Sequence, residues 1–234
     1  MSRLLALILL IFVSQLHAMS SHISAKSVDR AIALYSLKKE PELISMFKRA
    51  KVKYPPKQIA LLAFKKEQHI ELWAKDKKDA WKFIHTYPLT AFSGNLGPKL
   101  KERDGQIPEG LYRLTMFNPY STMHLSIMID YPNAFDKAQA FSDGRKNLGG
   151  DIFLHGKNKS VGCLAVGDRA IEQLFLLVRR VGLNNTQVII APNDLRLASP
   201  ATDIITQPKW LPKLYQKINL ALSKFPTQNK KKFF

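Results

Sequence analysis

The feature that most restricts the fold is a succession of short aliphatic and aromatic runs between residues 58 and 131. These runs are IALLAF (59–64), HIELWA (69–74), AWKFIHTY (80–87), GLYRLTMF (110–117) and MHLSIMIDY (123–131). The charged segments KKEQ and KDKKD separate the first three, and a loop rich in Gly and Pro occupies 93–110. Runs of this length and composition, bounded by turn signals, are typical of β-strands. We predict a meander of strands, followed by further strands at DIFLH (151–155) and TQVIIAP (186–192).

Three other segments have helical periodicity. Residues 27–53 read as two helical pieces, the second opening at Pro41, because proline is well tolerated at the first position of a helix. Residues 168–181 carry an apolar stripe behind Asp168, which we expect to cap the helix. Residues 208–224 predict a last amphipathic helix. The terminal helices could pack on the strands, bind a partner or lie on a membrane. Mostly strands, few helices and no βαβ alternation predict an α+β, mainly β, fold class.

The N-terminus has the three-part form of a secretory signal peptide. Arg3 precedes an unbroken apolar run from Leu4 to Val13, and a polar stretch ends at Ala18. That run is about half of the ~20 residues that a spanning helix needs, so a cleaved leader fits better than a membrane anchor. We predict a signal peptide at 1–18 and an exported, periplasmic protein.

The net charge of +18 indicates contact with polyanions. An exported protein meets cell-wall polymers and lipid headgroups rather than nucleic acid, and the chain has none of the aromatic and basic interleaving of single-strand binders. The charge is scattered as well as clustered, so a solvated basic surface is the simplest interpretation. Peripheral membrane or polyanion contact stays open, and no nucleic-acid partner is expected.

Cys163 is the only cysteine, which is unusual for an exported chain because cysteines there normally occur in pairs. It can be a reactive thiol, a buried inert thiol or half of an intermolecular disulfide. A buried inert cysteine behaves as a small hydrophobe and belongs in an apolar run. Cys163 instead follows Gly-Lys-Asn-Lys-Ser-Val-Gly, which favours the reactive thiol.

A histidine eight positions earlier supplies the base that a thiol nucleophile needs. His155 ends a predicted strand, Gly156 lets the chain turn, and a hairpin-like return would bring Cys163 alongside the imidazole. Backbone N–H groups near Gly162 could face a developing oxyanion, and Ser160 could fix the shape of the turn. Lys157 and Lys159 would add positive potential that favours the thiolate. A plain connection between strand and helix is the competing interpretation.

A metal site is less well supported than this thiol chemistry. The chain has neither H-E-x-x-H nor C-x-x-C, and its other histidines are scattered. We expect neither a metal nor a cofactor.

The segment LHGKNKSVGCLA resembles the signature of the L,D-transpeptidase catalytic domain, the YkuD-type family. Two upstream features agree with its YafK-like branch, in which the segment between the histidine and the cysteine is short. They are GPK with DGQIPEG, at Gly97–Lys99 and Asp104–Gly110, and the strand and turn SIMIDYPNAFDKA at 126–138. The resemblance covers roughly Ala60 to Pro192. On this basis the chain divides into a helical N-terminal extension at 19–57, a catalytic domain at 58–192 and a C-terminal helix with a basic tail at 193–234.

The resemblance implies a β-sandwich or barrel that carries its site in a groove. It implies that Cys163 is the nucleophile, that His155 donates and accepts the proton, and that the Gly156 carbonyl orients the imidazole. It also implies that the N–H groups of Gly162 and Cys163 bind the oxyanion. The substrate would be the stem peptide of peptidoglycan, cleaved between an L-centre and a D-centre, with the acyl group passing to Cys163 and then to an amine.

The chain departs from the usual family pattern at two positions. Val161 stands where most members have histidine, and Ala165 stands where most have arginine. If that arginine binds a substrate carboxylate, Lys99, Arg103 or Lys157 would have to replace it, with Ser160 as a further substrate contact.

Three functions stay open at this point. The first is an L,D-transpeptidase. The second is a carboxypeptidase or amidase-type hydrolase that uses the same Cys/His pair on wall peptides, or on the linkage between the wall and a lipoprotein, since the YafK-like branch includes an enzyme that releases a wall-linked lipoprotein. The third is a non-catalytic cationic wall-binding protein.

Overall fold

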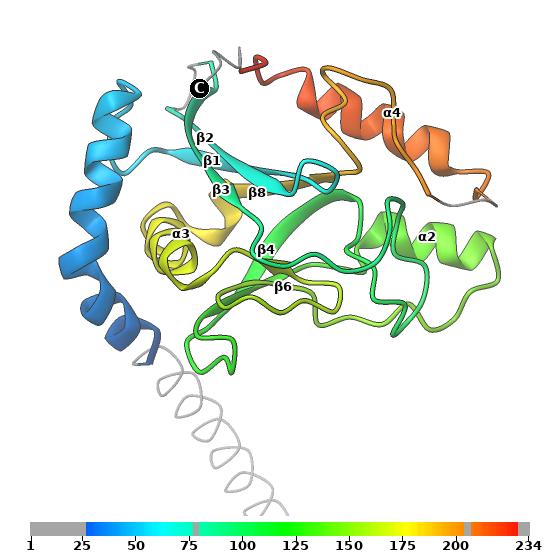
Figure 1. Ribbon diagram of the computed structural model, residues 1–234, viewed down its shortest axis with the longest axis horizontal. Coiled ribbons are helices and arrows are strands. Elements are labelled where there is room, and N and C mark those ends of the chain that lie inside the picture. Colours follow the sequence, from blue (N-terminus) through cyan, green and yellow to red (C-terminus); the bar gives the residue numbers. More distant parts are fainter. Residues whose placement is uncertain (1–26, 77–79, 204–206, 229–234) are drawn as a thin grey trace, which may run out of the picture.

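A computed structural model describes residues 27–76, 80–203 and 207–228, and within them a single mixed sheet organises the molecule (Figure 1). The sheet has eight strands in the order β3-β2-β1-β8-β4-β5-β6-β7. The strands are β1 (Gln58–Phe64), β2 (His69–Lys75), β3 (Lys82–Pro88), β4 (Gly110–Asn118), β5 (Ser126–Ile129), β6 (Phe153–His155), β7 (Leu164–Ala165) and β8 (Thr186–Ala191). The predicted α+β, mainly β, fold class is confirmed.

Two antiparallel meanders make up the sheet, and the late strand β8 joins them. Strands β1, β2 and β3 pair antiparallel, as do β4, β5 and β6. Strand β8 lies between the meanders, parallel to β1 and antiparallel to β4. The short strand β7 extends the far edge by pairing parallel to β6. This edge is the part of the sheet that carries the His155–Cys163 segment.

Helices cover both faces of the β1 end of the sheet (Figure 1). A helix spanning residues 27–49 and α3 (Asp168–Val181) pack on one face, and α4 (Leu211–Leu222) packs on the other. In β1, Leu61 belongs to the first core and its neighbour Leu62 to the second. Because both sides of this strand are buried, it reads as a continuous apolar run rather than an alternating one.

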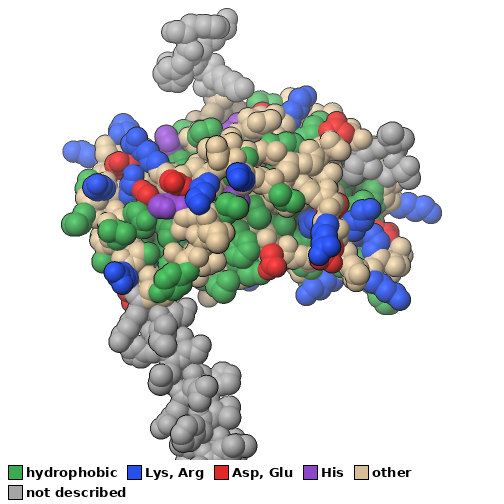
Figure 2. Space-filling model, turned by 60° about the horizontal axis from the view of Figure 1, so that its bottom comes forward, with side chains coloured by type: hydrophobic (Ala, Val, Ile, Leu, Met, Phe, Trp, Pro, Cys, Tyr) green, Lys and Arg blue, Asp and Glu red, His purple; other side chains and the backbone are tan. Residues whose placement is uncertain are grey.

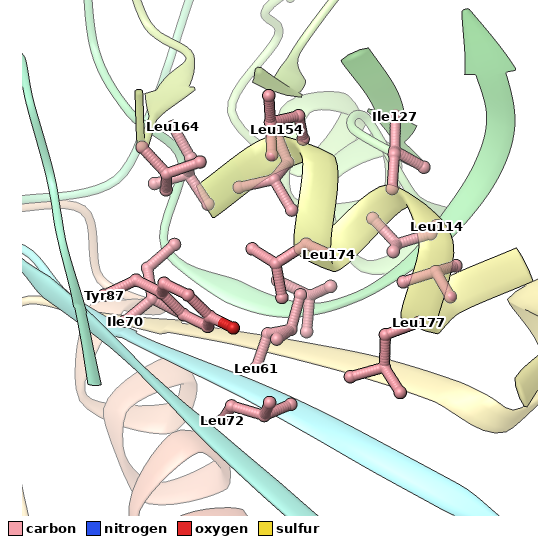
Figure 3. Close-up of a cluster of buried hydrophobic side chains, with 14 of the residues drawn as sticks. Leu61, Ile70, Leu72, Tyr87, Leu114, Ile127, Leu154, Leu164, Leu174 and Leu177 are labelled. Carbon is pink, nitrogen blue, oxygen red and sulfur yellow. The ribbon is translucent and has the colours of Figure 1, made fainter. Parts of the chain in front are cut away.

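Helix α3 fills the centre of the larger core. Leu174 and Leu177 point from α3 into a cluster that takes side chains from β1, β2, β4, β5, β6 and β7 (Figure 3). Leu154 of β6 and Leu164 of β7 lie in this cluster, each about 1% exposed. The core therefore anchors the two strands on either side of the His155–Cys163 segment.

The N-terminal helix differs from the prediction, because residues 27–49 form one continuous helix with Pro41 inside it. Proline removes one helical hydrogen bond and usually kinks or ends a helix. Here Ala31 before Pro41 and Phe47 after it are buried in the same core. Arg180 of α3 also pairs with Glu40 at 2.8 Å, so packing on α3 favours continuity.

Two further elements were not predicted as such. Helix α2 (Ala134–Ser142) lies in the connection after β5, and Asn133 and Asp136 form a capping box at its start. Strand β7 is only two residues long, too short for a periodicity signal. The helix at 208–224 is present as α4, starting at Leu211 with Pro212 in its first turn, where proline is tolerated.

A buried ion pair holds the long loop 93–110 against the sheet. Lys65, just after β1, lies 3.0 Å from Glu109, and both side chains are 0% exposed. The Lys65 ammonium also donates to the carbonyls of Gly97 and Ile107 at 2.7 and 2.9 Å. The hydroxyl of Tyr215 in α4 donates to Glu109 at 2.9 Å. One buried charge pair thus connects a strand, the loop and the C-terminal helix.

No helix in the described residues is long and apolar enough to cross a bilayer. The predicted signal peptide and the basic tail at 230–232 lie outside the described residues.

Candidate active site

His155 ends β6 and Cys163 comes directly before β7, at the β7 edge of the sheet. Strand β7 pairs parallel to β6, with Leu154 opposite Leu164 and His155 opposite Ala165. The expected hairpin-like return is therefore wrong, since a hairpin would make the two segments antiparallel. Successive side chains of a strand alternate between its faces, so Leu154 and Leu164 enter the core. His155 and Cys163 consequently share the opposite face, where both line the same pocket.

Gly156 and the start of α3 fix the histidine side of the site. His155 is 3% exposed, and its Nδ1 lies 2.6 Å from the carbonyl oxygen of Gly156. A Cβ added to Gly156 would lie 2.6 Å from Asp168 Oδ1 and 2.9 Å from the Met123 carbonyl. Only glycine fits at this position, which explains the His-Gly pair in the sequence.

Asp168 does not cap α3 as predicted, because Gly167 is the N-cap residue. The Asp168 carboxylate instead accepts the N–H of Lys157 at 2.7 Å. It therefore fixes the turn that follows His155 to the beginning of α3.

The thiol of Cys163 is half-buried beside backbone groups of the preceding strand. The Phe153 N–H donates to its sulfur at 3.4 Å, and the thiol donates to the Asp151 carbonyl at 3.6 Å. Burial raises the pKa of Cys163, with a smaller contribution from the charge of Asp151, whereas the Phe153 N–H and the charge of Lys99 lower it. The cation that acts on the sulfur is thus Lys99, not the expected Lys157 or Lys159.

The pKa of His155 is lowered, because burial disfavours the charged imidazole more than the hydrogen bond to Gly156 favours it. A lowered imidazole pKa and a raised thiol pKa both favour the neutral forms. At neutral pH the free protein holds a thiol and a neutral imidazole in the same pocket, and the base must act when substrate is bound.

A serine from the distant loop organises the residues before Cys163. The N–H of Gly162 donates to Ser93 Oγ at 2.7 Å, and Ser93 Oγ lies 3.1 Å from Ser160 Oγ. Ser160 in turn donates to the Cys163 carbonyl at 2.8 Å. Gly162 has a φ of 104°, and a Cβ there would lie 2.9 Å from the Gln106 carbonyl. In this structure the Gly162 N–H is therefore occupied by Ser93 rather than directed at open space.

The pocket around these residues has a volume of about 400 Å³. Its lining residues are Asn118, Tyr120, Ser121, Thr122, Met123, Ser126, Phe153, His155, Lys159, Ser160, Val161 and Cys163. Tyr120 and Val161, both largely exposed, form apolar parts of its rim. A concave site with an apolar lining and a few polar groups is the usual form of a ligand site.

The three cations expected to contact substrate lie outside the lining of this pocket. Lys99 is buried and forms an ion pair with Asp104 at 2.6 Å. The side chain of Arg103 is 92% exposed and lies 3.9 Å from Glu102. Lys157 donates from Nζ to the Thr122 carbonyl at 2.6 Å. Of the expected substrate-binding residues, only Ser160 lines the pocket.

Sequence reasoning did not identify Ser93 or the turn at 118–123 as parts of the site. The turn lies between β4 and β5 and has no motif of its own, although Tyr120 within it is an exposed aromatic residue. Ser93 lies 69 positions before Gly162, so its role depends on the tertiary fold.

The surface charge is dispersed. On the face in Figure 2, Lys and Arg side chains form several separate groups, with hydrophobic and acidic side chains between them. Within the described residues, no group of three or more His, Cys, Asp or Glu has an arrangement that could hold a metal ion.

The chain belongs to the YkuD family, described as the L,D-transpeptidase catalytic domain, whose sequence model matches residues 58–190. It therefore carries the catalytic domain of a family of cell-wall enzymes. One relative within the family is YafK of Escherichia coli strain K12, which is described as a candidate L,D-transpeptidase. It is 31% identical to this chain over 134 residues. YafK of E. coli O157:H7 matches equally. The match covers 55% of this chain and 52% of either relative, so the chain spans about half of their length.

Two solved structures have a similar but more distant fold. The helical cell shape determining protein Pgp2 of Campylobacter jejuni has a TM-score of 0.47 at 21% identity, over 58% of this chain and 48% of Pgp2. Bd1075 of Bdellovibrio bacteriovorus has a TM-score of 0.42 at 20% identity, over 74% of this chain and 57% of Bd1075. With scores of this size, the family assignment rests on the sequence match.

Proposed function

We propose that this protein is a peptidoglycan L,D-transpeptidase that works through an acyl-enzyme on Cys163. The observation that carries the proposal is that His155, at the end of β6, and Cys163, just before the paired strand β7, line one pocket. The membership of the chain in a family of cell-wall enzymes supplies the substrate class.

The hydrogen bond of His155 defines which nitrogen acts as the base. The Gly156 carbonyl can only accept a hydrogen bond, so Nδ1 carries the proton and donates it at 2.6 Å. Nε2 is then the basic nitrogen of the neutral imidazole. This tautomer is ready to take the thiol proton when the sulfur attacks.

In the first half-reaction, the sulfur attacks the carbonyl carbon of the donor stem peptide while Nε2 removes the thiol proton. A C–S bond forms, and the carbonyl oxygen becomes an oxyanion. When the C–N bond breaks, the imidazolium returns its proton to the departing amine, and a thioester remains on Cys163. An acceptor amine then loses a proton to His155 and attacks the thioester, so that a new C–N bond forms and the C–S bond breaks. The imidazolium returns its proton to the departing sulfur and regenerates the thiol.

The N–H groups of Cys163 and Gly162 are the proposed oxyanion donors. The Gly162 N–H donates to Ser93 Oγ at 2.7 Å in the free protein. Binding of the oxyanion there would require Gly162 to exchange Ser93 for substrate. Gly156 orients the imidazole in this scheme, and Ser160 holds the nucleophile turn.

The acceptor decides between transfer and hydrolysis. A second stem peptide, or an amine of a wall-linked protein such as a lipoprotein, would complete a transfer, whereas water would make the same site a hydrolase. Export through the leader predicted at 1–18 belongs to this proposal, because peptidoglycan lies outside the cytoplasm. So does any contact of the basic surface with wall polymers or lipid headgroups.

The decisive experiment is incubation of the purified protein with defined stem peptides, with and without an acceptor amine, followed by mass spectrometry of the products. We expect a product joined to the acceptor and a covalent adduct on Cys163 of the wild-type protein. Release of free acid alone would establish the hydrolase instead. Unchanged product formation by Cys163→Ala would overturn the acyl-enzyme, and peptide binding without turnover by the wild-type protein would support a non-catalytic wall-binding role.

A further inference from the structure

Lys159 stands out among the residues around Cys163 because of its charge. Within the described part of the chain it is the only Lys or Arg that lines the pocket, and no Asp or Glu lines it. Its side chain is exposed, and no described carboxylate forms an ion pair with it. An unpaired cation at the rim of a largely apolar pocket is a site for an anionic group of a ligand.

The other candidate cations are paired elsewhere or lie outside the pocket. Lys99 is paired with Asp104, and the Nζ of Lys157 donates to the Thr122 carbonyl. Arg103 has a largely exposed side chain and lies outside the pocket lining. Lys159 is thus the cation with both the position and the free hydrogen-bonding capacity to meet a substrate.

The backbone on both sides of Lys159 is held in place. On one side, the N–H of Lys157 donates to Asp168 at 2.7 Å, and its carbonyl accepts from Thr90 at 2.6 Å. On the other side, Ser160 donates to the Cys163 carbonyl at 2.8 Å. These contacts fix the position of the Lys159 backbone relative to Cys163.

We propose that Lys159 binds a carboxylate of the donor peptide, next to the carbonyl that Cys163 attacks. The inference rests on the proposed function and names its substrate more closely, as a peptide with a free carboxylate beside the scissile bond. The ammonium pairs with that carboxylate, while Tyr120, Met123 and Val161 contact the apolar parts of the peptide. Lys159 then selects the substrate, and His155 and Cys163 perform the chemistry.

The test measures binding, so that it does not depend on turnover. Protein carrying Cys163→Ala is titrated with two donor peptides that differ only in a free or amidated carboxylate next to the scissile bond. We expect the free acid to bind about tenfold more tightly, in the range of a charge-assisted hydrogen bond. Adding Lys159→Gln should remove that preference, and adding Lys159→Arg should keep it.

The controls separate this role from a general effect of charge or folding. Lys137→Gln on α2, outside the pocket lining, removes the same charge and should leave the tenfold preference intact. Lys159→Gln in the otherwise wild-type protein should leave the rate of Cys163 alkylation unchanged, because the charges that act on the thiol are those of Asp151 and Lys99. Equal binding of the two peptides by Cys163→Ala, or a preference that survives Lys159→Gln, would overturn the inference. Failure of wild-type turnover would instead count against the proposed function.

Discussion

The carbonyl oxygen of Gly156 lies 2.6 Å from Nδ1 of His155 and fixes the tautomer of the imidazole. The same glycine is packed so tightly against Asp168 and the Met123 carbonyl that no side chain fits there. One residue thus positions the proposed base through its carbonyl and allows α3 to approach through its missing side chain.

Gly156→Ala should therefore inactivate the protein and destabilise it. The new methyl group would lie 2.6 Å from Asp168 Oδ1, and overpacking of this kind costs about 1–3 kcal/mol. We expect at least a hundredfold loss of turnover, since small displacements of catalytic groups have effects of about this size. Gly150→Ala is the matched control, because its nearest neighbour would be the Tyr131 carbonyl at 4.0 Å. Similar urea-unfolding midpoints and activities for both variants would contradict the packing argument.

The pH dependence follows from the directions of the two pKa shifts. Burial lowers the pKa of His155 from its ordinary 6.5. The neutral imidazole therefore predominates at pH 6.5, and turnover should fall on the acidic side only below this pH. Burial raises the pKa of Cys163 above its ordinary 9.0, so iodoacetamide alkylation of the free protein should keep rising beyond pH 9. An alkylation rate already at its plateau at pH 7 would indicate a thiolate–imidazolium pair and contradict this description.

Ser93→Ala should weaken catalysis more than it weakens folding. It removes the acceptor of the Gly162 N–H and the neighbour of Ser160, for a loss of about 1 kcal/mol in the free energy of unfolding. Turnover should fall about tenfold, because the turn before Cys163 loses its anchor. Ser93→Thr keeps the hydroxyl and should retain most of the activity. Full activity of the alanine variant would exclude a positioning role for Ser93.

Replacement of one partner of the Lys65–Glu109 pair should be strongly destabilising. Both side chains are fully buried, and a buried charge left without its partner costs about 3–5 kcal/mol. Lys65→Met and Glu109→Gln should each lower the urea midpoint, and the double variant should lose less than the sum of the two. Additive losses in this double-mutant cycle would show that the two residues act independently.

Asp136 should make the fold less stable as the pH rises from 4 to 6. Burial raises its pKa from 3.8 to about 6, against smaller opposing contributions from the hydrogen bonds of Asn133 and Tyr112. Since the folded pKa lies above the unfolded one, its stabilising contribution is complete below the unfolded pKa and is lost as the pH rises through 6. Asp136→Asn keeps a side-chain acceptor and removes the titration. The difference in unfolding free energy between wild type and variant should change by about 2 kcal/mol across this window, and a constant difference would contradict the shift.

Local composition predicted much of the sheet but not its connections. The run IALLAF of β1 is apolar throughout because helices cover both faces of this strand, and the same composition marks it as a strand. Strand β7 depends on a partner rather than on its own two residues. The continuity of the N-terminal helix across Pro41 depends on packing against α3, which a sequence window does not contain.

For the site, residue chemistry was more informative than spacing. His155 and Cys163 were expected in one site from their reactivity, and the structure places both in one pocket. The parallel arrangement that places them there was not foreseen, because eight positions also suit a hairpin. Lys99 was expected at the substrate, yet Asp104, five positions later, already neutralises it. A list of nearby cations does not show which of them is free.

The parallel pairing of β6 with β7 also bears on how the segment between them can vary. Its two ends are tied to the core through Leu154 and Leu164, whereas Lys157, Asn158, Lys159 and Val161 are exposed. Extra residues inserted at that outer stretch would bulge into solvent without changing the register of either strand. A one-residue slip of β7, by contrast, would turn the sulfur toward the interior. The exposed residues of this loop, and with them the choice of substrate, can therefore vary while β6 and β7 keep their positions.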